Sequence, residues 1–183
     1  MIEEKMIEEI KEKDNKFSEA KFYTKVDHIF IMILTAIMER DMSSVKHYLS
    51  DSIYNRFNEL VESYKNDQVI RLFDEMNVAS TYIIDYYVNK YGLNIVVKLV
   101  SRYMDYFVDE NGNFVSGHNE YRIEEPHHIT FTKALNTKEL GEIIRCPGCG
   151  HSLNINETGL CSFCGQTIDM KDYDYIITEI DEI

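Results

Sequence analysis

The sequence contains no tryptophan, only two prolines and only four cysteines among its 183 residues. The two prolines, Pro126 and Pro147, are too few for a proline-rich linker, and we find no internal repeat or low-complexity segment. The cysteines form two close pairs that suit a metal, so the sequence does not indicate the disulfide framework of a small secreted protein. These absences favour one ordinary folded domain with a small appendage.

Long apolar runs are also absent. The longest extends from Ile29 to Leu34, and on to Met38 with one threonine. A membrane-spanning helix needs about 20 apolar residues, so this run is predicted to be a buried helix. The charged start, Met1 to Lys5, is not followed by the apolar core of a signal peptide. We therefore expect no membrane span and a cytoplasmic location.

Basic residues are scarce, with 19 Lys and Arg against 32 Asp and Glu, so the net charge is −13. Zn²⁺ bound to four thiolates would make it about −15. Such a surface repels nucleic acid, and no basic patch is visible around the cysteines. The charge suits a soluble protein or one with a basic protein partner.

The chain is 44% hydrophobic and 12% aromatic, which is enough for a core. Apolar residues recur at helical spacing over residues 1–40, with a polar break at 11–16. Asp41 is predicted to cap a short helix that ends near Leu49, and Ser50 or Asp51 to cap a third one.

Strand-forming residues follow. Val78–Val88 and Asn94–Val108 are predicted to be two long strands joined at Tyr91-Gly92, and Asp109–Asn113 a turn. An excursion through Gly117 and Pro126 leads to a strand at His127–Leu135, and a last strand is expected at Tyr173–Ile180.

Helices followed by antiparallel strands indicate an α+β fold, with helices on one face of a curved sheet. We divide the chain into an N-terminal helical extension (1–16), an α+β domain (17–143), a zinc ribbon (144–168) and a C-terminal strand that returns to the main sheet (169–183).

The cysteines carry the clearest chemical signal. Cys146 and Cys149 form one Cys-x-x-Cys-Gly motif, Cys161 and Cys164 form another, and eleven residues separate Cys149 from Cys161. Four thiolates make a closed tetrahedral shell, which predicts one structural Zn²⁺ rather than a catalytic one.

Other interpretations of the cysteines remain open. One is an iron site like that of rubredoxin, for which the eleven residues between the two pairs are few. The others are four free thiols and two disulfides. His151 is a candidate substitute ligand, although a solvated turn residue is the simpler interpretation. Because adjacent strand residues face opposite sides, His127 and His128 are not expected to form a metal pair.

The order of several segments resembles the Tim44-like domain family, in its bacterial branch with a C-terminal zinc ribbon. The resemblance covers about residues 17–183 and rests on these segments: Arg40-Asp41, Leu49-Ser50-Asp51, Tyr54-x-x-Phe57, Asp105-Tyr106-x-Val108-Asp109 with Gly112 and Gly117, His128-Ile129-Thr130-Phe131-Thr132-Lys133, the ribbon, and Tyr175-Ile176-Ile177. Lys133 stands where arginine is common, and the first segment is acidic. The resemblance implies a cone of three helices wrapped by a curved sheet, as in the nuclear-transport-factor-two-like superfamily.

Three functions follow as hypotheses. The first is a non-catalytic binding or scaffold protein, linked through the family to protein transport, whose concave side engages a protein, a peptide or a small apolar ligand. A second copy of the chain is a further candidate partner. The second is a small-molecule enzyme or carrier that uses the cone cavity. The third is nucleic-acid binding through the ribbon, which the negative charge disfavours.

The enzyme hypothesis has candidate residues on the predicted strands. They are Asp85, Arg102, Asp105 and His128, with Tyr82, Tyr86 and Tyr103 nearby. Solvent-facing residues or a cross-strand Asp–Arg pair are the simpler interpretation. No phosphate loop, nucleophile elbow or His-Glu-x-x-His motif is present, so we expect no catalysis.

Overall fold

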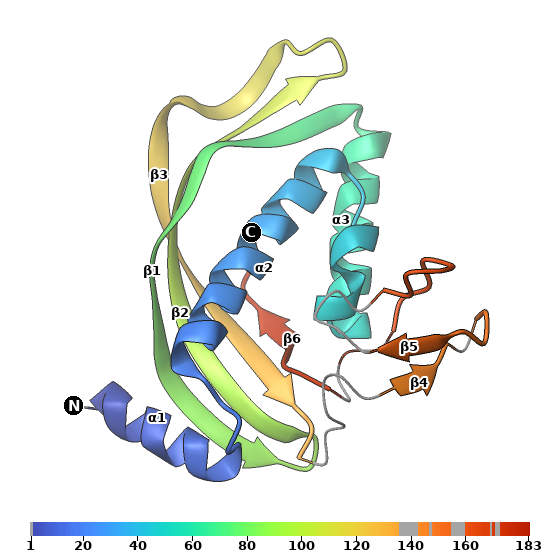
Figure 1. Ribbon diagram of the computed structural model, residues 1–183. Helices are drawn as coiled ribbons and strands as arrows, with labels where there is room; N and C mark the ends of the chain where they lie inside the picture. The colour runs from blue at the N-terminus through green and yellow to red at the C-terminus, as the bar shows by residue number, and fades with distance from the viewer. Residues whose placement is uncertain (1, 136–142, 147, 155–159, 169, 171–172) are drawn as a thin grey trace.

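Helices come first along the chain and strands follow, as Figure 1 shows. The computed structural model describes residues 2–135, 143–146, 148–154, 160–168, 170 and 173–183. Its elements are α1 (Ile2–Lys13), α2 (Glu19–Glu39), the 3-10 helix η1 (Ser43–Tyr48), α3 (Asp51–Asn66), β1 (Val69–Asn89), β2 (Gly92–Asp109), β3 (Phe114–Lys133), β4 (Ile143–Arg145), β5 (Ser152–Asn154) and β6 (Ile176–Ile180). The predicted α+β class is confirmed.

Strands β1, β2, β3 and β6 form one antiparallel sheet in that order. The sheet curves around the helices (Figure 1). Three register shifts interrupt the pairing of β1 with β2, and each leaves the extra residue in β1. At the first shift Glu75 adopts a φ of 53°. Because a bulge bends and twists its strand, the curl of the sheet has a local cause in β1.

Two strands are longer than the sequence predicts. β1 begins at Val69 rather than Val78, and β3 begins at Phe114, where an excursion was expected. Residues 114–126 instead continue the ladder with β2, and most of their side chains are exposed. The alternation that marks a half-buried strand is therefore missing there. Pro126 is tolerated because β6 pairs only with Ile129–Thr132, so β3 is an edge at that point.

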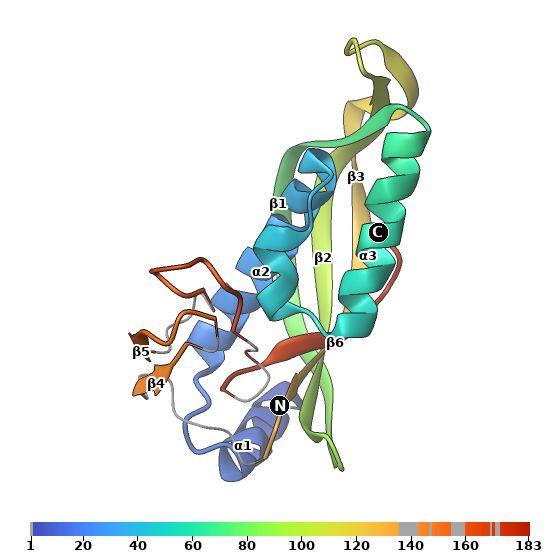
Figure 2. The same ribbon diagram turned by 90° about the vertical axis from the view of Figure 1, so that its right-hand side faces the viewer.

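The concave face of the sheet is packed against α2. Figure 2 shows α2 and α3 on the same side of the strands. Ile29 and Ile33 of α2 belong to one fully buried core with Ile95, Val97 and Leu99 of β2. The concave side, which the sequence offers as a ligand site, is therefore filled by apolar side chains over these elements.

Local caps explain where the later helices begin. The Ser50 hydroxyl accepts a hydrogen bond from the backbone N–H of Ile53 at 3.5 Å, so Ser50 is the N-cap of α3 as predicted. Asp41 was predicted to cap the short helix before it, but Met42 occupies the N-cap position, and the Asp41 carboxylate accepts the N–H of Ser43 at 2.9 Å from one residue further out. The element that follows is a 3-10 helix, a geometry usual in short connectors.

The chain returns to the main sheet after the cysteines. β6 pairs with β3, and on its other side the N–H of Ser50 donates to the carbonyl oxygen of Ile177 at 2.8 Å. The strand begins at Ile176, three residues later than predicted. The division of the chain after residues 16, 143 and 168 stays a prediction.

Helix α1 docks on the edge strand β1. Ile7 and Ile10 are buried in the main core. Glu3 accepts the N–H of Ile83 at 3.0 Å, and Glu9 accepts the hydroxyl of Tyr86 at 2.6 Å. Two of the acidic residues of the first segment therefore anchor this helix to the sheet.

Candidate metal centre and a lysine-lined cleft

The four cysteine sulfurs form one compact cluster, within 4.8 Å of one another. The Sγ atoms of Cys146 and Cys164 are 3.7 Å apart, and those of Cys149 and Cys161 are 3.8 Å apart. A disulfide requires about 2.05 Å, so the four thiols are free. Sulfurs at about 2.3 Å from a zinc ion lie about 3.8 Å apart in a regular tetrahedron. The cluster therefore fits a tetrahedral metal ion.

Each cysteine pair lies in its own tight turn, and the two turns have the same hydrogen-bond pattern. The N–H of Cys146 donates to the carbonyl of His151 at 2.8 Å, and the N–H of Gly150 donates back to the carbonyl of Cys146 at 2.9 Å. Cys161 and Gly165 repeat both bonds in the second turn. Gly150 and Gly165 both have a φ of 72°, which is why glycine follows each pair.

Backbone N–H groups point at the sulfurs of both turns. Gly148 donates to Sγ of Cys146 at 3.3 Å, and Phe163 donates to Sγ of Cys161 at 3.4 Å. A backbone hydrogen bond from Cys149 lowers the pKa of the Cys146 thiol to about 7. These donors favour the thiolate, the form that binds metal, at Cys146 and Cys161. At Cys149 and Cys164 a backbone hydrogen bond also lowers the pKa of the thiol, but burial and the neighbouring sulfurs outweigh it, so the pKa of both thiols is raised.

His151 lies beside the cluster. Its ring stacks on the exposed ring of Phe163, with centroids 3.8 Å apart and planes 23° apart. Among the residues that the structure describes, the group of candidate ligands consists of the four cysteines. A set of four sulfurs is closed and leaves no position for a reacting water.

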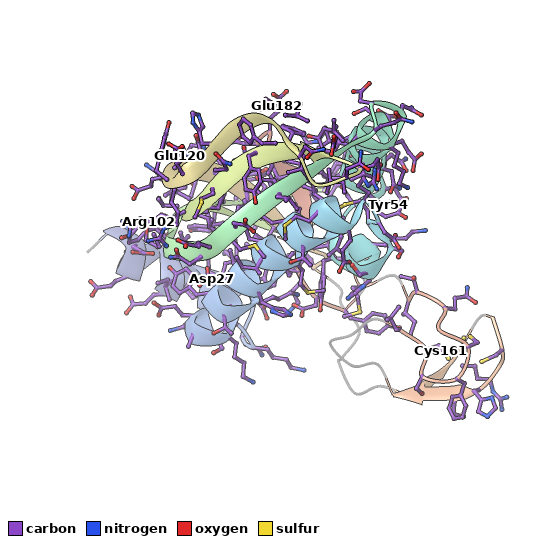
Figure 3. The ribbon with its side chains drawn as sticks, turned by 90° about the horizontal axis from the view of Figure 1, so that it is seen from above. Asp27, Tyr54, Arg102, Glu120, Cys161 and Glu182 are labelled. Atoms are coloured by element: carbon purple, nitrogen blue, oxygen red, sulfur yellow. The ribbon has the colours of Figure 1, made fainter. Side chains whose placement is uncertain are left out.

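A small second core joins the cluster to the main sheet. Cys146 and Cys161 are buried with Ile168, Met170, Tyr173 and Ile176. Ile176 is also the first residue of β6. Figure 3 shows that the segment carrying Cys161 lies on the helical side of the molecule, away from Arg102 and Glu120 on the sheet.

The structure keeps the candidate catalytic residues apart. Asp105 makes a bidentate ion pair with Arg71 across β1 and β2, at 2.8 and 2.9 Å. Arg102 pairs with Glu124 at 2.7 Å on the exposed part of the sheet. Asp85 is exposed and accepts a hydrogen bond from the N–H of the next residue.

The three tyrosines near those candidates are separated as well. Tyr103 is buried in the main core, Tyr82 is exposed, and Tyr86 is held by α1. Burial raises the pKa of Tyr103 to about 12, which leaves its hydroxyl protonated at neutral pH. These side chains do not converge on one site.

The two adjacent histidines face opposite sides of β3, as expected. His127 is buried, with its ring 4.8 Å from that of Phe30 and its Nε2 2.9 Å from the hydroxyl of Ser101. His128 is exposed, and its Nδ1 is 3.0 Å from a carboxylate oxygen of Asp181. No metal can be shared by the two rings in this arrangement.

A cleft of about 1020 Å³ lies along the N-terminal half of α2, beside the face that packs on the sheet. Its walls come from the connection between α1 and α2, from α2, from the end of β3, and from Tyr173, Asp174 and Tyr175. Five lysines line it, with three carboxylates. The lysines are Lys13, Lys16, Lys21, Lys25 and Lys133.

Ion pairs hold the walls of the cleft together. Lys25 lies 2.7 Å from Asp174, and its Nζ also donates to the carbonyl of Tyr175 at 2.8 Å. Lys133 lies 2.7 Å from Asp14, which also accepts the hydroxyl of Tyr175 at 3.0 Å. Burial, and then Asp14, raise the pKa of the Tyr175 hydroxyl far above its usual value.

Sequence reasoning missed this cleft, although part of the signal was present. Lys21, Lys25 and His28 are spaced four and three residues apart, so they share one stripe of α2. That stripe flanks the buried one, which contains Val26, Ile29 and Ile33. The contributions of β3 and of residues 173–175 depend on the fold.

Comparison with known protein families finds one family whose model matches the chain. The model of the Tim44-like domain matches residues 3–142, which is more than half of the chain. The chain belongs to the Tim44-like domain family. In this Tim44-like domain the match includes α1 and ends before the cysteines. No curated protein matches the chain. Among the described helices, none combines the length and apolar content that crossing a membrane requires.

Proposed function

We propose that this Tim44-like domain is a non-catalytic binding or scaffold protein that engages a protein or peptide and carries one structural Zn²⁺. The observation that carries the proposal is the pairing of the candidate acid–base residues. Asp105 is neutralised by Arg71, and Arg102 is paired with Glu124 at a separate place on the sheet. General acid–base catalysis needs such groups at one reacting centre.

The ligand set supports zinc. The four sulfurs have the spacing of a tetrahedral site, and both turns direct N–H groups toward sulfur. Iron of the rubredoxin type uses the same donors, but the eleven residues between Cys149 and Cys161 are few for it. With no open position on the metal, its role is to stabilise a segment too small to fold on its own core.

The cellular part of the proposal comes from the family and from chemistry. Four reduced cysteines suit the cytoplasm. The family resemblance supports a link with protein transport. The net charge of −13 supports a protein partner over nucleic acid.

Native mass spectrometry of protein purified without added metal tests the proposal. We expect one zinc ion per chain and no retained small molecule. A stoichiometric organic ligand would instead support the carrier or enzyme hypothesis. Iron in place of zinc, seen by mass and by the visible absorption of a ferric thiolate centre, would correct the metal alone. Assays of this sample for retention on nucleic acid at physiological salt should be negative.

A further inference from the structure

The lysine-lined cleft reverses the charge balance of the molecule. Acidic residues outnumber basic ones by 32 to 19 in the whole chain. Among the residues that line the cleft, five lysines stand against Glu12, Asp14 and Asp174. Asp14 and Asp174 each already bind a lysine of the cleft. The lining therefore keeps an excess of positive charge in a protein that is otherwise strongly negative.

The chain itself shows what kind of segment this surface accepts. Residues 173–175 run along the cleft as Tyr-Asp-Tyr, with Asp174 on Lys25. The ring of Tyr175 packs against Phe22 at 5.4 Å and against Phe17 at 6.3 Å. The cleft therefore already binds one acidic side chain through a lysine, next to a tyrosine ring that packs on apolar side chains.

Further lysines and a further apolar side chain line the cleft. Lys13 and Lys21 are exposed on α1 and α2. Leu135 lines the cleft with 58% of its surface exposed. A ligand that carries both carboxylates and apolar side chains would complement these groups.

We propose that this cleft binds an acidic peptide segment of a partner protein, with aspartate or glutamate on Lys13 and Lys21 and an apolar or aromatic side chain against Leu135. The inference rests on the proposed binding function and adds the site and the chemical class of the partner. A peptide fits better than a nucleic acid because a short segment needs only a few local cations, whereas nucleic acid needs many phosphate contacts, which the net charge of −13 opposes.

Fluorescence anisotropy with a synthetic peptide tests the site directly. The probe is a fluorescein-labelled peptide of interspersed aspartate, glutamate and tyrosine, and its control replaces the acidic residues with asparagine and glutamine, because a lysine peptide would be attracted by the net charge of −13. We expect saturable binding of the acidic peptide alone, weakened by added salt because exposed ion pairs are screened. Equal binding of both peptides, or of neither, would overturn the proposal.

Charge reversal locates the site. The double variant Lys13→Glu with Lys21→Glu should bind the acidic peptide at least about tenfold more weakly, since two exposed ion pairs are lost and two repulsions gained. Lys98→Glu makes the same type of change on the other face of the sheet, opposite Tyr82. It should change the affinity less than about twofold. Circular dichroism melting confirms that each variant is folded.

Other results would distinguish an error in the cleft assignment from an error in the proposed binding function. Unchanged affinity in the double variant would overturn the cleft assignment. Vesicles of phosphatidylglycerol that bind in a Lys13- and Lys21-dependent way, while the peptide does not, would assign the cleft to a lipid surface instead. A partner protein retained equally by wild type and the double variant would keep the binding function and overturn only this inference. A co-purified small molecule would contradict the binding function itself.

Discussion

Lys133 and Asp14 form an ion pair in which Nζ lies 2.7 Å from a carboxylate oxygen, joining the end of β3 to the connection between α1 and α2. Their side chains are only 14% and 11% exposed. Tyr175 donates to the same carboxylate, and the Lys133 ammonium lies 5.4 Å from its ring. Three distant parts of the chain therefore meet at one carboxylate.

Replacing Lys133 should destabilise the fold. Lys133→Met leaves the nearly buried Asp14 carboxylate with two neutral donors, the hydroxyl of Tyr175 and the backbone N–H of Lys16, and with no cation in contact. We therefore expect a loss of about 2 to 3 kcal/mol in the free energy of unfolding by urea. Lys133→Arg retains the positive charge and should lose less than about 1 kcal/mol. Equal losses in the two variants would show that side-chain packing, rather than charge, is what matters.

Metal removal should loosen the C-terminal part of the sheet. The cysteine cluster shares its small core with Ile176, which begins β6, so chelation should lower the melting temperature. Hydrogen exchange should accelerate in β6 while the β1–β2 pairing remains protected. The variant Cys161→Ser should reproduce both effects without chelator. An unchanged melting temperature after complete metal loss would contradict this coupling.

Acid should destabilise the fold through two buried histidines. Burial lowers the pKa of His127 and of His47 to about 4. Both are then neutral in the folded protein, whereas in the unfolded chain they titrate near 6.5. Below pH 6.5 these histidines bind protons in the unfolded chain but not in the folded one. The free energy of unfolding therefore falls between about pH 6.5 and 4.

His127→Phe isolates one of these contributions. The new ring would remain against Phe30, and the change in unfolding free energy between pH 7 and pH 5 should shrink by about 1 to 2 kcal/mol. His128→Gln is the control, because that side chain is 53% exposed. If urea unfolding of His127→Phe kept the wild-type pH dependence, the buried histidine would not be its source.

Two turn glycines provide a matched pair. Gly92 has a φ of 145°, and a Cβ there would lie 2.0 Å from the backbone oxygen of Lys133. Gly112 has a φ of 83° with nothing within 4 Å of the same position. Gly112→Ala should cost about 1 kcal/mol of unfolding free energy from strain alone. Gly92→Ala should cost about 3 kcal/mol, because the backbone must move as well.

Local signals were enough for several elements. Ser50 caps α3 because a hydroxyl placed before an apolar stripe satisfies a free backbone N–H. Gly112 in the Asp109–Asn113 turn supplies the positive φ that the turn needs. The spacing of the cysteines similarly predicted a four-sulfur cluster, since each short motif places two thiols on one turn.

Other elements had no local signal. Residues 69–77 are interrupted by a bulge at Glu75, and residues 114–126 are largely exposed, so neither stretch alternates like a half-buried strand. Their pairing with β2 extends ladders that begin elsewhere. Asp105 shows the same limit, since its partner Arg71 lies thirty-four positions away.

The sequence by itself determined the helices-then-strands order, the acidic surface and the cysteine cluster, because each depends on neighbouring residues or on composition. The tertiary structure alone decided that the concave face is filled by α2 and that a cleft forms beside the buried face of that helix. Lys21, Lys133 and Asp174 reach that cleft from α2, β3 and the C-terminal segment. Only the packing of β3 and the C-terminal segment beside α2 brings these charges together.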